Sequence, residues 1–538
     1  MKSAPSLGRA GSAMALGTVL SRLTGLIRTA ALAAALGVTS LADSYNIANT
    51  VPTILLVLVT GGTLSAVLIP LLVEPEEPAD RVRRAESLGA LVLVVTGAAA
   101  LGAAVLSPLL ARLFALGLRG DPDYGDFVGS TTLLLVLFAP QVVAYGVSVH
   151  AVAVLNAAGR LALGSFASIA TNVLTLAAIG AYVALRPDSG AGTRELVVLG
   201  AGTTAGVFAM TAIQVWGARR VLPGMHLLPR LKRDETTSRV LRLGRWTLVY
   251  VVANQVGLAV VLTVAAGTPG TASAYQWAFA VMQLPFAVIA VSVLSAVYPR
   301  MSRAAKDDLP RFEVLVADGL RLLLLLLLPA AVLLVALAGP VTQLLLGYGA
   351  VDGAGVRLIA AAVAVFGVAL LPFTAFQLMT RAFYARGDTR VPALVNVVVN
   401  TVNVAGALAA LGTYDGSTQR TIVVLVASYA ASYLVGCAVL GTVLRRQVRG
   451  AFAGVAGLSV RLILPSAAMA AAAVGALALV RTTELGDAKV AAAAEVVVGS
   501  VAAGAVYLIL VYGLARSALP TLGRTVVGSG SNAPADVG

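Results

Sequence analysis

The sequence predicts an all-α polytopic membrane protein with about fourteen transmembrane helices. Three observations support this fold class. Apolar runs near or above about twenty residues recur along the chain, basic residues gather in alternate loops, and two stretches of sequence repeat at a common shift. We expect two six-helix lobes in parallel pseudo-repeat, followed by two C-terminal helices.

The composition argues against a soluble protein. Of the 538 residues, 59% are hydrophobic and 12% are charged, and the mean hydropathy is +0.92. A soluble chain of this length needs more charge to cover its surface. The net charge of +14 would suggest nucleic acid in a soluble protein. In a membrane protein it is explained by basic cytoplasmic loops, so no nucleic-acid partner is expected.

The apolar runs give the predicted spans in order, and strand barrels are excluded because the runs are continuous rather than alternating. The predicted spans are residues 11–37, 44–73, 86–115, 127–155, 161–185, 195–217, 245–266, 272–298, 314–347, 355–383, 391–412, 421–444, 456–480 and 488–515.

The charges of the loops test this span count. If both termini are cytoplasmic, alternate loops should be basic, and they are, whereas the intervening loops are near neutral or acidic. The basic loops carry Arg81, Arg83 and Arg84; Arg219 to Arg242; Arg300, Arg303 and Lys306; Arg386 and Arg390; and Arg445, Arg446 and Arg449. The pattern predicts a multi-pass protein of the bacterial plasma membrane with cytoplasmic N- and C-termini.

An internal repeat divides the chain. The run Ala42-Asp43-Ser44-Tyr45 recurs as Ala272-Ser273-Ala274-Tyr275, and Leu155 to Gly159 recurs as Phe383 to Gly387, both shifted by about 230 residues. The repeated spans have the same predicted orientation, so the repeat is parallel. We expect an N-lobe at 1–220, a C-lobe at 221–450, two further helices at 451–516 and a disordered cytoplasmic tail at 517–538.

Two arginines lie in the first predicted span. A charge at mid-bilayer costs about 2.5–3.5 kcal/mol on insertion scales, so Arg22 and Arg28 should face a cavity or a partner. A spacing of six places them about 120° apart on an ideal helix, unless Gly25 breaks it. They are candidates for gripping phosphate oxygens. Alternatively, Arg22 snorkels to the interface and Arg28 pairs with a carboxylate.

The second predicted span opens with Asp43, which can be an arginine partner, an ion-coupling site or the N-cap of its own helix. Asn46 and Asn49 follow it and are candidate substrate contacts. Hinge candidates in the same region are Pro52, Gly61 and Gly62, in addition to Gly25.

Three polar residues lie in the spans that echo the first two. Asn254, Gln255 and Gln283 are therefore candidate cavity residues, although most intramembrane amides serve as hydrogen bonds between helices. No enzyme, metal site or cofactor is expected. The chain has no P-loop and no HExxH motif, its only cysteine is Cys437, and its two histidines, His150 and His226, lie far apart.

Several runs resemble the MurJ/MviN lipid II flippase family of the multidrug/oligosaccharidyl-lipid/polysaccharide exporter superfamily, over essentially the whole chain. They are residues 21–28 (SRLTGLIR), then Asp43, Pro52 and Pro70, and residues 298–303 (YPRMSR) and 381–389 (RAFYARGDT). The resemblance implies a flippase that carries an undecaprenyl-pyrophosphate-linked peptidoglycan precursor from the inner to the outer leaflet by alternating access.

The same resemblance implies a cationic cavity with Arg22, Arg28 and Asp43, a lipid-tail groove formed by the last two helices, and coupling to an ion gradient or the membrane potential rather than ATP. Leu56 and Ala280 depart from the family, which commonly has arginines there. The implied partners are a polyprenyl-linked lipid, the bilayer and cell-wall synthesis proteins. Alternatives are transport of another polyprenyl-linked glycan or lipid, a drug or ion antiporter of the superfamily, and a non-transporting cell-wall scaffold.

Overall fold

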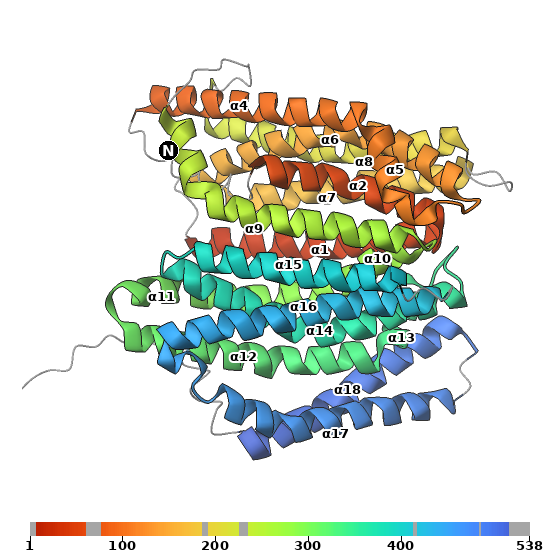
Figure 1. The fold of residues 1–538 in the computed structure, drawn as a ribbon, viewed down its shortest axis with the longest axis vertical. Coiled ribbons are helices and arrows are strands. Elements are labelled where there is room, and N and C mark those ends of the chain that lie inside the picture. The colour runs from red at the N-terminus through yellow and green to blue at the C-terminus, as the bar shows by residue number, and fades with distance from the viewer. Residues whose placement is uncertain are drawn as a thin grey trace, which may run out of the picture. The chain divides into compact units, whose positions relative to one another are not determined.

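The computed structural model describes residues 7–60, 77–185, 192–224, 235–412, 417–483 and 486–515. Every regular element within these ranges is a helix (Figure 1). This is what a continuously apolar chain requires, because the backbone N–H and C=O groups in lipid must be satisfied inside the segment.

Contacts divide the chain into two compact units, and the first comprises residues 1–273 and 348–355. Its helices are α1 (Leu7–Leu36), α2 (Ser40–Thr60), α4 (Pro78–Val105), α5 (Ser107–Phe114), η1 (Leu116–Leu118), α6 (Tyr124–Ala157), α7 (Leu161–Leu185), α8 (Thr193–Val221) and α9 (Glu235–Ala266). In this unit α7 packs against α1 and α8, and α6 packs against α2, α4 and α8.

The second unit comprises residues 274–347 and 356–538. Its elements are α10 (Thr271–Pro285, with its first turn in the first unit), a π-helical turn η2 (Phe286–Ala290), α11 (Val291–Asp307), α12 (Leu309–Ala336), α13 (Ala338–Leu346), α14 (Gly353–Ala385), α15 (Arg390–Gly412), α16 (Thr418–Gln447), η3 (Arg449–Phe452), α17 (Val455–Arg481) and α18 (Ala488–Ala515). The predicted N-lobe ends at residue 220, whereas α9 packs against α2 and α5 within the first unit.

Thirteen helices among the described residues are long and apolar enough to cross a membrane. They agree with the predicted fold class of about fourteen spans. The predicted second span, 44–73, is described only as far as Thr60, where α2 ends. The predicted tail at 517–538 lies outside the described residues.

Two predicted spans are wrong in one detail, because each contains two helices. The span 86–115 breaks at Leu106 between α4 and α5, and the span 314–347 breaks at Leu337 between α12 and α13. Pro108 and Pro340 lie in the first turn of the helix that follows each break. A proline has no N–H to donate, so neither can continue the preceding helix's hydrogen-bond ladder.

The internal repeat is visible in backbone geometry. After α6, Arg160 N–H donates to Leu155 O at 2.8 Å, and after α14, Asp388 N–H donates to Phe383 O at 3.0 Å. The turns place Gly159 and Gly387 at φ 73° and 79°. The pairs α4–α5 and α12–α13 also correspond, each a long helix followed by a short one. The two copies of the repeated sequence therefore share this local geometry, and their parallel orientation stays a prediction.

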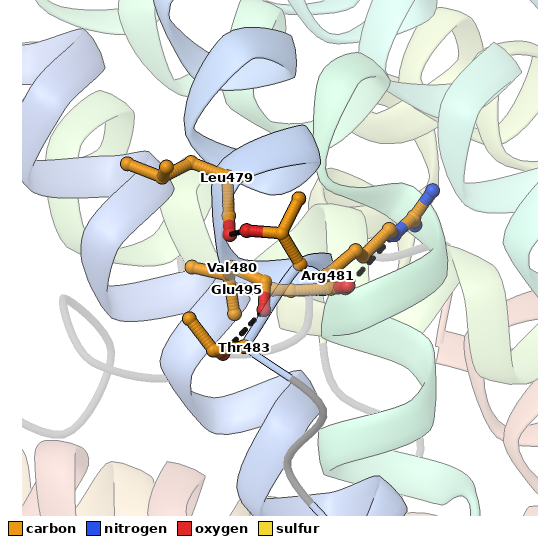
Figure 2. Close-up of polar contacts among 6 residues, drawn as sticks. Leu479, Val480, Arg481, Thr483 and Glu495 are labelled. Carbon is orange, nitrogen blue, oxygen red and sulfur yellow. Dashed lines mark hydrogen bonds and ion pairs between the residues drawn. The ribbon is translucent and has the colours of Figure 1, made fainter.

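The last two helices lie side by side (Figure 1) and are joined by an ion pair near one end. Arg481 Nε lies 2.8 Å from a carboxylate oxygen of Glu495 (Figure 2). The hydroxyl groups of Thr482 and Thr483 donate to the carbonyls of Leu479 and Val480 and so terminate α17. Tyr507 of α18 donates to Leu325 O of α12 at 2.8 Å, which fixes the pair to the second unit.

Candidate functional site

The two arginines of α1 differ in exposure. α1 is one continuous helix through Gly25, so Arg22 and Arg28 point about 120° apart. Arg22 is exposed, next to the exposed apolar side chains of Val19 and Leu23, whereas Arg28 is half-buried. The hinge role of Gly25 remains a prediction.

Asn172 of α7 holds α1 at the level of these arginines. Its Nδ2 donates to Thr24 Oγ1 at 2.8 Å and to Ser21 O at 3.1 Å. A methyl group at Gly25 would lie 3.7 Å from the same nitrogen, so the helices approach closely here. These contacts hold α1 against α7 in the stretch next to Arg22 and Arg28.

Arg28 lies among phenol groups of the first unit. Its guanidinium interacts electrostatically with the hydroxyls of Tyr45 in α2 and Tyr145 in α6. Tyr45 is itself fixed, because its hydroxyl lies 2.8 Å from Thr203 Oγ1 and its ring packs edge-on against Phe138. Polar hydroxyl groups therefore lie near Arg28, and no carboxylate among the described residues forms an ion pair with it.

No carboxylate among the described residues neutralises the charges of Arg22 and Arg28. In the described ranges, neither arginine forms an ion pair. Asp43, the acid expected nearby, is fully buried and directed elsewhere. An unpaired guanidinium that is half removed from water favours an anionic partner, above all one with planar or tetrahedral oxygens that can accept two hydrogen bonds.

Asp43 holds the start of α10. One carboxylate oxygen accepts the Gly270 N–H at 2.7 Å and the other accepts the Ser273 N–H at 2.7 Å. Of the three roles left open for Asp43, the N-cap of its own helix is excluded, because Thr39 Oγ1 accepts the Ala42 N–H and caps α2. Asp43 instead satisfies the free N–H groups at the first turn of a helix far away in sequence.

Asn46 takes part in the same contact. Its Nδ2 donates to Ser273 Oγ at 3.0 Å and to Ala42 O at 3.0 Å. Asn49, one turn further along α2, is half-buried and its side chain forms no hydrogen bond among the described residues. Of these two asparagines, only Asn49 has a side-chain amide that makes no hydrogen bond to the described residues and could therefore bind a ligand.

The remaining candidates are placed separately. On α9, Asn254 donates to Tyr250 O at 3.1 Å, and Gln255 is half-buried. Gln283 lies half-buried on α10 in the second unit, just before Pro285 and the π-helical turn. Pro52 lies within continuous α2. The hinge candidates Gly61 and Gly62 lie outside the described residues.

Glycines allow close backbone contacts at the α1–α2 end of the first unit. The Ala350 N–H donates to Ala34 O at 2.8 Å, and a Cβ on Gly37 would lie 2.8 Å from Ala350 O. A Cβ on Gly270, where φ is +81°, would lie 2.7 Å from the carbonyl carbon of Val38. This end of the unit, which also contains Asp43, is closed by packed backbone.

Sequence reasoning did not identify Tyr45, Tyr145 and Thr203 as neighbours of Arg28, and it did not single out Asn172. One signal was present for Asn172, because Asn400 stands at the shift of about 230 residues that relates the repeated stretches. The residues around Arg28 come from α2, α6 and α8, and no local pattern connects them.

Comparisons with known proteins agree with one another. Residues 32–511 match the family model described as lipid II flippase MurJ. The chain is 26% identical over 521 residues to a probable lipid II flippase MurJ of Rhizobium meliloti, covering 95% of this chain and 94% of that protein. It is 27% identical over 395 residues to the lipid II flippase MurJ of Burkholderia cenocepacia, covering 71% of this chain and 74% of that protein.

Solved structures show the same fold. A lipid II flippase MurJ in an inward closed conformation matches with a TM-score of 0.73 at 17% identity, covering 94% of this chain and 99% of that one. An inward-facing multidrug resistance MATE family transporter of the MOP superfamily matches with a TM-score of 0.62 at 12% identity, covering 79% of this chain and 95% of that one.

Proposed function

The chain belongs to the MurJ family of lipid II flippases, and from this membership we propose that it moves lipid II from the inner to the outer leaflet with a head-group site centred on Arg28. The observation that carries the proposed site is the half-buried Arg28 guanidinium, which has no ion-pair partner among the described residues. The pyrophosphate of the lipid would supply the missing negative charge.

The arrangement around Arg28 supports reversible binding. Tyr45 and Tyr145 place neutral hydroxyls near the guanidinium, so a phosphate that leaves does not expose the arginine to a competing carboxylate. Arg22, about 120° around α1 and exposed, would meet the anion first. The family resemblance implies further arginines at the positions of Leu56 and Ala280, so we propose that this chain binds the head group with fewer cations. Asn49, with its amide available, is the next contact that we propose.

The closed end of the first unit supports alternating access. We propose cytoplasmic N- and C-termini, as the basic loops favour. The contacts of Asp43 with Gly270 and Ser273 would then lie at the outer surface and close it. Release of the head group requires these hydrogen bonds to break, and the energy for the cycle would come from an ion gradient or the membrane potential.

We also propose separate roles for the three segments predicted from the repeat. Residues 1–220 and 221–450 would act as the two rocking lobes, and 451–516 as the groove for the polyprenyl tail. The groove role is supported by α18, whose exposed side chains include Val497, Val501, Leu508 and Ile509. Cell-wall synthesis proteins are the partners we propose outside the bilayer.

Complementation of a flippase-depleted bacterium tests the proposal. The chain is expressed in cells depleted of their native flippase, and the lipid II that an externally added cleaving enzyme can reach is measured. We expect restored access, lost in Arg28→Ala and retained in Arg160→Ala, which removes an exposed arginine from the turn between α6 and α7. Full activity of Arg28→Ala would remove Arg28 from the site. No restoration with protein present in the membrane would favour another polyprenyl-linked cargo or a scaffold.

A further inference from the structure

A basic hollow lies at the end of α16, in the second unit, whereas the arginines of α1 belong to the first unit. Its volume is about 620 Å³, and it is lined by Thr442, Arg445, Arg446 and Arg449. This size falls within the range of about 300–1,000 Å³ that is typical of small-ligand pockets. The hollow is therefore large enough for a phosphate-bearing group.

Local geometry brings the three guanidinium groups to one place. Thr442, Arg445 and Arg446 lie three and four positions apart on α16, which puts them on one side of the helix. The helix ends at Gln447, and Arg449 opens the short helix η3. Two backbone bonds hold this change of direction, Val448 N–H to Leu444 O at 2.8 Å and Ala451 N–H to Val448 O at 3.2 Å. Arg449 therefore faces the same hollow from a second element.

The three positive charges that line this hollow have no carboxylate partner among the described residues. Within the described part of the chain, Arg445, Arg446 and Arg449 form no ion pair. A fourth arginine, Arg386, donates to Gln447 at 2.7 Å and adds positive charge to the same helix end. Glu313 lies against Gly450 but pairs with none of the three arginines. Like charges this close repel one another, and a bound anion would relieve the repulsion.

General rules for membrane proteins account for only part of this arrangement. Basic residues are favoured at helix C-termini and in cytoplasmic loops, which explains three arginines in this segment. Neither rule requires the side chains to converge on a common hollow. The hollow is what indicates a binding site.

The length and charge of α16 favour a position of the hollow at the level of lipid head groups. The helix has 30 residues, which corresponds to about 45 Å, whereas the hydrocarbon core of a bilayer is about 30 Å thick. Part of the helix therefore extends beyond the hydrocarbon, and the charges of Arg445 and Arg446 favour the last turn as that part.

We propose that Thr442, Arg445, Arg446 and Arg449 form a binding site for a phosphate-bearing anion at the membrane surface. The exposed guanidinium groups would donate to the phosphate oxygens, and the Thr442 hydroxyl adds a polar wall. The phosphate can come from an anionic phospholipid head group or from a soluble phosphate. The site requires only that the chain spans a membrane, so it does not depend on which cargo α1 binds.

The test uses the purified full-length protein and phosphatidylglycerol as the probe. Native mass spectrometry counts the phosphatidylglycerol molecules retained by the wild type and by the triple variant Arg445→Gln, Arg446→Gln and Arg449→Gln. We expect at least about tenfold weaker retention in the triple variant, since each arginine near an anionic surface contributes to the attraction. A matched variant, Arg219→Gln, Arg220→Gln and Arg303→Gln, removes the same charge from exposed positions on α8 and α11 and should retain the lipid.

A second variant separates a built site from general attraction of charge. The triple variant Arg445→Lys, Arg446→Lys and Arg449→Lys keeps the positive charge but loses the planar guanidinium groups. We expect this variant to retain phosphatidylglycerol severalfold more weakly than the wild type. Phosphatidylglycerol retention equal to wild type in either the lysine or the glutamine variant, together with pyrophosphate binding that does not depend on the arginines, would overturn the proposal. Inorganic pyrophosphate is added in a parallel titration. Competition with phosphatidylglycerol would support one shared site, and arginine-dependent binding of pyrophosphate alone would identify a soluble anion as the ligand.

Discussion

Asp43 and Ser273 occupy equivalent positions in the two copies of the internal repeat, and they contact each other directly. The carboxylate of Asp43 accepts the Ser273 N–H at 2.7 Å, and Asn46 of the same helix donates to the Ser273 hydroxyl. One copy of the repeat thus caps the first turn of a helix in the other copy.

Replacing Asp43 by Asn should loosen this contact. The amide can accept one N–H but presents its own N–H₂ group to the second, so one of the two donors, Gly270 or Ser273, loses its partner. We expect a loss of about 1–3 kcal/mol of stability, seen as a lower thermal midpoint in detergent. Ser44→Ala is the matched control, because among the described residues the Ser44 hydroxyl bonds only within its own helix, to Ser40 O. Equal midpoints for wild type and Asp43→Asn would show that the capping bonds contribute nothing.

Gly270→Ala should lower the thermal stability more than Gly120→Ala, a substitution at another glycine of similar backbone conformation. Gly270 has φ +81° and its Cβ would meet backbone atoms of Val38 at 2.7 Å, whereas Gly120 has φ +89° and open space around it. Both substitutions carry the conformational penalty of about 1–2 kcal/mol, and only Gly270→Ala adds the clash. Thermal unfolding of the two variants compares them. A similar loss in both would mean that the Val38 contact is easily displaced.

The interaction of Asn172 with Thr24 should be measurable as a coupling between α7 and α1. Removing either partner, as Asn172→Ala or Thr24→Val, breaks the 2.8 Å hydrogen bond between them. We expect a coupling energy of about 0.6 kcal/mol, and at most about 1.7, as for other hydrogen bonds between membrane helices. A double-mutant cycle on thermal stability gives this value. Strict additivity of the two substitutions would argue that Asn172 acts through Ser21 O alone.

The Arg481–Glu495 pair should respond asymmetrically to mutation. Glu495 is mostly buried, whereas the Arg481 side chain is 64% exposed. Arg481→Ala leaves a buried carboxylate without its partner, while Glu495→Gln leaves an exposed arginine that water solvates, so the arginine substitution should destabilise more. Hydrogen exchange at the end of α17 reports the local effect. Greater exchange in Glu495→Gln than in Arg481→Ala would contradict this explanation.

The spans could be predicted from the sequence because each is a local run of apolar residues. The repeat could be predicted because similar residues recur about 230 positions apart. The predicted span 127–155 lies within α6, and the repeated stretch ending at Gly159 and Gly387 forms the same turn twice. The breaks at Leu106 and Leu337 were missed because the apolar runs continue through them, and only Pro108 and Pro340 indicate where the helices end.

The site was harder to predict. Arg22, Arg28 and Asp43 stand out as charges in apolar runs, but the partner of Asp43 is a pair of backbone N–H groups 227 and 230 residues away. A backbone donor has no sequence signature. For the same reason Tyr45 and Tyr145 could not be assigned to Arg28, since each is an ordinary tyrosine until α2 and α6 are packed together.

The contact between Asp43 and Ser273 also constrains how the two copies of the repeat could evolve after duplication. If both copies carried an acid here, two carboxylates would compete for the same small space, with Asn46 beside them, and like charges at this distance cannot both remain ionised without a large cost. A serine in one copy supplies the N–H and the hydroxyl that the acid and the amide of the other copy require. At this position, divergence of the duplicated sequence is what allows its two copies to join.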